Sequence, residues 1–330
     1  MKVAIQCSSF GQRCGISTYS NRVDRYLNGV KNVSSKLFVE RIRNGIDVIC
    51  INYEPGLIPP QQLNYFINKY TKVPIVITAH HIGNLPQFYP AIDGVILHSK
   101  DQIPGNTPEQ IKQNEPWDYI VIPHPALVFP KKDKKKLRKK YGLPEDKLVI
   151  GTAGFIVGTG KEIPNMSNLL IRNLKDDEFF YCITSMWKGG DWGKIDKTMS
   201  KVKKSGREKQ FRMDSDFVSD EILNEKMQCC DLLFAWNNMY YGTHKGSQSG
   251  IAADMYGSRV KTIVKDGPHY SFIGQQEKVL VGRPQPEQFI EDVLKALRSD
   301  QLKDIQDPKH LSWETMIHQY VEYFRQFLEK

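Results

Sequence analysis

Residues 2–20 have the sequence KVAIQCSSFGQRCGISTYS, and this stretch decides the fold. The short apolar run at residues 2–6 predicts a buried strand, and the glycines at positions 11 and 15 predict a tight turn. From Ile16 onward the residues have the pattern of a helix. A strand that leads through a glycine-containing turn into a helix is the opening unit of a doubly wound α/β domain.

The same alternation of short apolar runs and helix-length amphipathic segments continues along the chain, which predicts βα units that feed a parallel sheet. In the first half we expect strands at residues 2–6, 36–39, 47–52, 74–78, 94–98 and 119–122, and helices at 16–29, 60–70 and 108–114. In the second half we expect strands at 148–152, 179–184, 210–213, 232–236, 262–264 and 279–281, and helices at 165–175, 219–229, 249–257, 286–299 and 313–328. The predicted fold class is α/β, with two Rossmann-like doubly wound domains facing a central cleft.

A chain of 330 residues exceeds the size at which one hydrophobic core keeps growing, so two domains are expected. The segment Pro123-His124-Pro125, followed by Phe129-Pro130 and a basic run at 131–140, breaks the pattern and suits an interdomain linker. We therefore predict a first domain over residues 1–128 and a second over 129–311. A C-terminal helix over 312–330 is expected to pack back towards the first domain.

Composition narrows the class of protein but not its partner. Hydrophobic residues make up 40% of the chain and charged residues 25%, as in ordinary globular proteins. No run approaches the ~18 to 20 apolar residues that span a bilayer, no signal peptide is evident, and the six cysteines lack C-x-x-C spacing. These features predict a cytoplasmic protein with reduced thiols.

The chain carries a net charge of +9, which favours an anionic partner. Nucleotide phosphates, nucleic acid and an acidic membrane surface all satisfy that requirement. The basic run at 131–140 is equally compatible with a solvated helix start and with a dedicated binding patch.

Two glycine-containing turns follow predicted first strands, one in each half. The first contains Gly11 and Gly15, and the second contains Gly154 and Lys161. Glycine lets the backbone approach a ligand, and free N–H groups at a helix start favour phosphate. Lys161 is a candidate for neutralising a diphosphate, although neither turn has a complete nucleotide-binding signature and either could be a bare βα turn.

His80 and His81 lie at the carboxyl end of a predicted strand, where ligands of open α/β sheets bind. A histidine there can hydrogen-bond a sugar hydroxyl or transfer a proton. Neighbouring side chains of an extended segment point to opposite sides, so one of the two is structural. His98 and His124 also follow strands, and we interpret each as a hydrogen-bonded packing residue.

A further segment, 246–257, places small polar residues before a helix. Ser247, Ser249 and Gly250 would present hydroxyl and amide groups where the helix begins, which suits phosphate. A serine N-cap on a helix packed against the sheet explains the same residues.

In order along the chain, these motifs resemble those of retaining GT-B glycosyltransferases of the family-four kind, particularly members with a C-G-I-x-T-Y start. The matching segments are CGISTYSNRV at 14–23, NYEPGL at 52–57, VITAHH at 76–81, VILHS at 95–99, VIPHP at 121–125, GFI at 154–156 with a lysine at 161, VSDEIL at 218–223, QSGIAADMYGSRV at 248–260 and HLSWE at 310–314.

The resemblance implies that the first domain serves the acceptor and that the second holds a nucleotide-diphosphate sugar such as a UDP- or GDP-sugar. It implies transfer with retention and no obligatory metal or other cofactor. His80 would lie beside the transferred sugar, and Lys161 would stabilise the leaving diphosphate. The donor-binding residues would be Gly11, Gly15, Gly154, His244, Ser247, Ser249 and Gly250.

Two positions depart from the family pattern. Phe155 stands where an arginine is usual, so that phosphate contact is lost or comes from elsewhere, with Arg13 and Lys245 as candidates. The usual pair of glutamates is replaced by His244 and Ala252, while Asp254 is out of register.

The leading hypothesis is a glycosyltransferase whose acceptor is a saccharide, a lipid-linked saccharide or a hydroxymethylated DNA base, as in phage-type enzymes of this fold. The net positive charge would help to hold DNA or a membrane-associated glycan. A sugar-nucleotide epimerase of the same architecture and a non-catalytic nucleotide-sugar-binding module remain as alternatives. The replaced glutamate pair supports the binding module.

Overall fold

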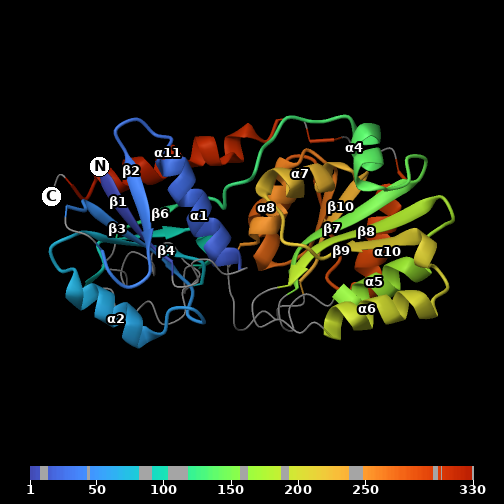
Figure 1. Ribbon diagram of the computed structural model, residues 1–330, viewed down its shortest axis with the longest axis horizontal. Coiled ribbons are helices and arrows are strands. Elements are labelled where there is room, and N and C mark those ends of the chain that lie inside the picture. The colour runs from blue at the N-terminus through green and yellow to red at the C-terminus, as the bar shows by residue number, and fades with distance from the viewer. Residues whose placement is uncertain are drawn as a thin grey trace. The chain divides into compact units, whose positions relative to one another are not determined.

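The computed structural model describes residues 1–7, 14–42, 45–81, 91–102, 118–156, 163–186, 193–237, 248–299, 304–305 and 307–328. The chain divides into two compact units (Figure 1). The first takes in Met1–His124 and the terminal segment Trp313–Lys330, and the second takes in Pro125–Thr243 and Ser249–Ser312.

The first unit is built on a parallel six-stranded sheet with the order β2-β1-β3-β4-β5-β6. Its strands are β1 (Lys2–Gln6), β2 (Ser34–Phe38), β3 (Val48–Tyr53), β4 (Ile75–Ala79), β5 (Gly94–Leu97) and β6 (Asp118–Val121). Every residue of β3, β4 and β5 is buried, which explains why these strands are continuous apolar runs. The strand order reverses beside β1, and ligands of open α/β sheets bind at such a point.

Among the described residues, the helices that cover the first sheet are α1 (Gly15–Leu27), α2 (Pro60–Lys69) and the terminal α11 (Trp313–Arg325). Helix α1 begins where the Cys14 side chain accepts a hydrogen bond from the backbone N–H of Ser17 at 3.3 Å. Helix α11 packs against α1, where the Trp313 ring stacks on Tyr26 with 5.6 Å between centroids. Helix α2 lies on the opposite side of the sheet from α1 (Figure 1).

The second unit repeats the design with a parallel six-stranded sheet in the order β12-β11-β10-β7-β8-β9. Its strands are β7 (Leu148–Ile156), β8 (Glu178–Met186), β9 (Phe211–Asp214), β10 (Leu232–Ala235), β11 (Thr262–Lys265) and β12 (Val279–Gly282). The order reverses between β7 and β10, so the carboxyl ends of these two strands are the ligand-binding position expected for this topology.

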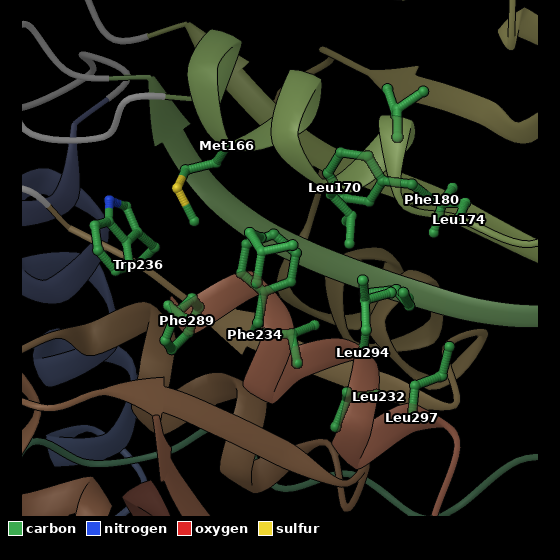
Figure 2. Packing of buried hydrophobic residues seen from close by; sticks show 14 of the residues in the cluster. Met166, Leu170, Leu174, Phe180, Leu232, Phe234, Trp236, Phe289, Leu294 and Leu297 are labelled. Atoms are coloured by element: carbon green, nitrogen blue, oxygen red, sulfur yellow. The ribbon is translucent and has the colours of Figure 1, made fainter. Parts of the chain in front are cut away.

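Helices cover both faces of the second sheet. They are α4 (Lys134–Tyr141), α5 (Ile163–Arg172), α6 (Gly193–Lys204), α7 (Asp220–Gln228), α8 (Gly250–Gly257), the short α9 (Ser271–Gly274) and α10 (Pro286–Leu297). Helices α5 and α10 contribute Leu170 and Phe289 to a core that also contains Phe180 of β8 and Phe234 of β10 (Figure 2). The helix α7 begins at Ser219, whose side chain accepts a hydrogen bond from the Ile222 N–H.

The predicted strands all occur, and the two-domain α/β prediction is confirmed. Strand β7 continues past the predicted end at residue 152, because Gly154 stays in register with β8 while its carbonyl accepts a hydrogen bond from the Thr184 hydroxyl at 2.9 Å. Helix α6 was not predicted, since it is rich in lysine and buries only Thr198 and Val202. The helix predicted at 108–114 lies outside the described residues.

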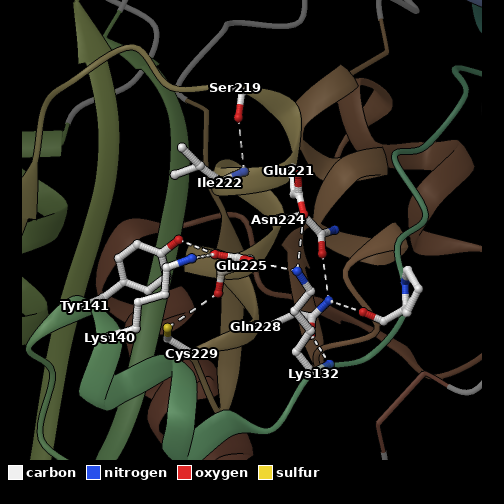
Figure 3. A network of polar contacts seen from close by, with 11 residues as sticks. Lys132, Lys140, Tyr141, Ser219, Glu221, Ile222, Asn224, Glu225, Gln228 and Cys229 are labelled. Atoms are coloured by element: carbon white, nitrogen blue, oxygen red, sulfur yellow. Dashed lines mark hydrogen bonds and ion pairs between the residues drawn. The ribbon is translucent and has the colours of Figure 1, made fainter.

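The basic run at 131–140 leads into α4 and forms most of that helix, and five of its eight cations pair with carboxylates, chiefly of α7 and the residue Asp231 (Figure 3). Glu225 of α7 pairs with Lys132 at 2.7 Å and with Lys140, and this lowers the pKa of Glu225 to about 2. Lys134 and Arg138 both pair with Asp231. These contacts favour a structural role for the run over a dedicated binding patch.

The six cysteines are all buried and free. None of the described helices combines the length and apolar content that crossing a bilayer requires.

Candidate functional site

Polar side chains gather at the carboxyl ends of four neighbouring strands in the first unit. They are Asn52 near the end of β3, Thr78 in β4 and His80 directly after it, His98 after β5 and His124 after β6. All except His80 are at most 7% exposed. Parallel strands end at one edge of a sheet, so the topology assembles these side chains although they are far apart in the sequence.

His98 is a neutral hydrogen-bonded side chain. Its Nδ1 lies 3.0 Å from the carbonyl oxygen of Ile122, which can only accept, so Nδ1 carries the proton and Nε2 a lone pair. Nε2 is buried and makes no hydrogen bond. Burial lowers the pKa of His98 to about 4, in agreement with its interpretation as a packing residue.

His80 lies against His98 with 5.2 Å between ring centroids, and its Nε2 is likewise buried without a hydrogen-bond partner. Burial, followed by the nearby His98 and His124, lowers the pKa of His80 well below its usual value. The ring is therefore neutral at pH 7. It is suited to hydrogen-bond a ligand hydroxyl and unsuited to supply positive charge.

Tyr19 of α1 joins the three histidines to the terminal helix. Its ring centroid lies 4.5 Å from that of His80, 5.4 Å from that of His98 and 5.1 Å from that of His124. Its hydroxyl is hydrogen-bonded to the hydroxyl of Tyr320 in α11. Neither tyrosine is among the site residues predicted from the sequence, where the only signal is the position of Tyr19 in the CGISTYS segment.

In the second unit, helix α8 begins at the carboxyl edge of the sheet. Ser249 is its N-cap and accepts a hydrogen bond from the Ala252 N–H at 3.3 Å, while its own N–H donates to the His269 carbonyl. Gly250 is the first helical residue. The serine N-cap predicted for this segment is thus present, and the helix directs its positive end at this edge.

The end of β7 that contains Gly154 lies at the same carboxyl edge of the sheet. Gly154 has a φ of +124°, which an L side chain rarely adopts, so the glycine is required by the backbone. The next residue, Phe155, stacks on Phe217 with 6.0 Å between centroids. An aromatic contact therefore occupies the position where the family pattern has an arginine.

Asp254 has a structural partner. Its Oδ1 accepts a hydrogen bond at 3.0 Å from the backbone N–H of Leu127, in the segment that follows β6. Gly257, one turn later, leaves room for the Leu127 carbonyl. Asp254 is therefore part of the packing of α8.

A small cavity of about 20 Å³ lies between the ends of β7 and β10 and the helices α5 and α8. Its wall includes Trp236, Ser167 and Ile251. The Trp236 indole nitrogen and the Ser167 hydroxyl are both buried without a hydrogen-bond partner. The cavity has room for about one water molecule, which could bond to these polar atoms.

The remaining predicted site residues are Gly15 and several residues that the structure does not describe. Gly15 is the first residue of α1, and a methyl group added there would meet no atom within 4 Å. Gly11, Lys161, His244 and Ser247 lie outside the described residues, as do the alternative cations Arg13 and Lys245.

Solved structures share this architecture over the whole chain. Sucrose-phosphate synthase from Thermosynechococcus elongatus is 11% identical, with a TM-score of 0.75 over 100% of this chain and 99% of that chain. HepE from Anabaena, solved in complex with UDP and glucose, is 11% identical, with a TM-score of 0.72 over 99% of this chain and 100% of that chain. A glycosyltransferase from Rickettsia africae is 13% identical, with a TM-score of 0.70 over 100% of this chain and 99% of that chain.

The chain has the GT-B fold. No protein-family model matches the sequence, and no curated protein matches it either. The GT-B fold expected from the sequence motifs is thus confirmed by the tertiary structure. The sequence identity to these structures is so low that the likeness is visible only in the fold.

Proposed function

We propose that this protein is a glycosyltransferase that takes its sugar from a nucleoside-diphosphate sugar, in the first instance a UDP-sugar, bound by the second unit. The observation that carries the proposal is the arrangement at the β7 and β10 ends, where a required glycine and the capped start of α8 lie at the carboxyl edge of the sheet, at its switch point. The full-length likeness to HepE solved with UDP and glucose supports it.

The resemblance to family-four enzymes suggests which residues would bind each part of the donor. The start of α8 would hold phosphate through its N–H groups and its dipole, and the uncharged His80 would hydrogen-bond a hydroxyl of the transferred sugar. Lys161 would supply positive charge to the leaving diphosphate. By resemblance to family-four enzymes, transfer proceeds with retention, without an obligatory metal, to a saccharide or lipid-linked saccharide.

Binding is tested first, by isothermal titration of the protein with UDP, GDP and ADP. We expect at least one of them, with UDP favoured, to bind in the presence of EDTA. If none of the three binds, the proposal is wrong.

Transfer is tested by following UDP release from a panel of UDP-sugars, with the acceptor supplied as a mixture of saccharides. His80→Ala should lower the rate roughly a hundredfold, the usual cost of one lost transition-state hydrogen bond. His318→Ala, which removes an exposed histidine of α11, is the matched control and should leave the rate unchanged. The anomeric proton of the product, measured by NMR, shows whether configuration is retained.

A second candidate function is nucleotide-sugar binding without transfer. Phe155 packs on Phe217 where the family has a cation, and the fully buried Ala252 stands where it has a glutamate. Tight binding of a UDP-sugar with no release of UDP under any acceptor condition would favour this candidate.

A further inference from the structure

Lys265, the last residue of β11, is a partly buried cation that forms no ion pair with a carboxylate among the residues that the structure describes. Its Nζ donates to the backbone carbonyl of Asn237 at 2.9 Å and lies 4.6 Å from the centre of the Trp236 ring. Burial lowers the pKa of Lys265, and the adjacent Asp266 only partly opposes this effect without forming an ion pair. Buried cations elsewhere in the unit do have such partners, as in Arg138 with Asp231 and Lys226 with Asp214.

The position of Lys265 is the carboxyl edge of the sheet. Val264 pairs with Ala235 of β10, so the next residue along each strand brings Lys265 beside Trp236. Trp236 lines the cavity between β7 and β10 together with Ile251 of α8. Trp236 therefore contacts the ammonium group of Lys265 and also lines a cavity bordered by Ile251 in the first turn of α8.

The polar groups around this cavity are donors in need of an acceptor. Within the described part of the chain, the indole N–H of Trp236, a side chain only 5% exposed, has no hydrogen-bond partner. The N–H groups of Gly250 and Ile251 precede the first intrahelical hydrogen bond of α8. An uncompensated cation, an unpaired indole N–H and a helix start at one edge form a set of donors that an anion completes.

We infer that Lys265, held over Trp236, is a phosphate-binding residue of the donor site and replaces the charge that Phe155 does not supply. The inference rests on the proposed function and deepens it, because it assigns the diphosphate of the nucleotide to the β10–β11 side of the switch point. The ammonium group lies on the indole and reaches the ligand by exchanging its bond to the Asn237 carbonyl for one to a phosphate oxygen. Neither the family pattern nor the sequence motifs assign either side chain.

The inference is tested by titrating the protein with UDP, UMP and uridine. Lys265→Met should weaken the binding of UDP roughly ten- to hundredfold, as expected for a lost hydrogen bond to a charged group. It should not change the binding of uridine. The loss of affinity for UMP should lie between the losses for UDP and uridine, because Lys265 is proposed to bind the phosphate groups. Lys265→Arg should restore most of the affinity for UDP, which separates charge from packing.

Lys261→Met is the matched control, since Lys261 directly precedes the same strand and is also partly buried. It lies four residues, roughly 13 Å, from Lys265 at the opposite end of the strand, so it should not change UDP binding. Thermal melting of each variant shows that the fold is kept.

The outcomes distinguish the two proposals. If the wild type binds UDP and Lys265→Met binds it equally well, the assignment of Lys265 is wrong and the proposed function stands. An equal loss of affinity for UDP and for uridine would show that Lys265 only supports the packing of Trp236, which also overturns the assignment. If the wild type binds no nucleotide, both proposals fail.

Discussion

The carboxylate of Asp254 is hydrogen-bonded to the backbone N–H of Leu127 at 3.0 Å, and this contact fastens helix α8 to the segment that enters the second unit. Leu127 is fully buried and Asp254 is 3% exposed. Because α8 begins at the candidate phosphate position, the contact also fixes where the start of that helix lies.

Replacing Gly257 with alanine should displace this segment from α8. A Cβ atom at Gly257 would lie 2.3 Å from the carbonyl oxygen of Leu127, which is backbone and cannot rotate away. We expect Gly257→Ala to lower the free energy of unfolding by about 1 to 3 kcal/mol, measured by urea denaturation. Gly56→Ala is the control, because a Cβ atom there would meet nothing within 4 Å. Equal stability of the two variants would contradict the close packing.

Removing the N-cap of α8 should affect both stability and ligand binding. Ser249→Ala loses the hydrogen bond to the Ala252 N–H, at a cost of about 1 kcal/mol, and frays the helix start proposed to hold phosphate. Ser219→Ala removes the equivalent cap of α7 and should lower stability without changing UDP affinity. Calorimetry and thermal melting of both variants separate the two effects, and parallel losses of affinity would argue against a ligand at α8.

The histidine cluster should make the first unit sensitive to acid. The pKa of His98 is about 4 in the folded protein against 6.5 for an ordinary histidine, so the unfolded chain binds the proton first. The contribution of neutral His98 to the free energy of unfolding is therefore complete above pH 6.5. It is lost as the pH falls towards 4, at about 1.4 kcal/mol per pH unit.

His98→Asn can keep the donor to the Ile122 carbonyl while removing the titration. Urea denaturation between pH 7.5 and 4.5 should therefore show a shallower loss of stability for the variant than for the wild type. His318→Asn, at an exposed position, should retain the wild-type slope. Identical slopes for wild type and His98→Asn would contradict the assignment.

Two arginines near the ends of α10 should differ sharply in their contribution to stability. Arg298 pairs with Glu178, whose side chain is 1% exposed, whereas Arg283 pairs with Glu291 and Asp292 at the surface. Arg298→Met leaves a buried carboxylate without its cation and should cost about 3 kcal/mol. Arg283→Met should cost much less, because solvent screens its ion pairs, and 0.5 M salt should reduce only that smaller cost. Comparable losses in the two variants would contradict this distinction.

The sequence by itself determined the secondary structure and the fold. Strands buried on both faces are continuous apolar runs, as in β3 and β4, and the serine before α8 is a local N-cap whose partner lies three residues away. Such signals depend on neighbours along the chain, so they can be read without a tertiary structure. Helix α6 was missed although Ile195, Met199 and Val202 recur at helical spacing, because the many lysines between them hide this short apolar face.

Only the tertiary structure decided which side chains meet. Asp254 was known to be out of register, but its partner Leu127 is more than a hundred residues away, and Tyr19 meets Tyr320 across 301 residues. Lys265 gave no local signal, because a lysine at a strand end is usually solvated and becomes distinctive only when an indole ring desolvates it and no carboxylate neutralises it. Burial and missing charge partners are properties of the packed chain, so the candidate site could be completed only from the fold.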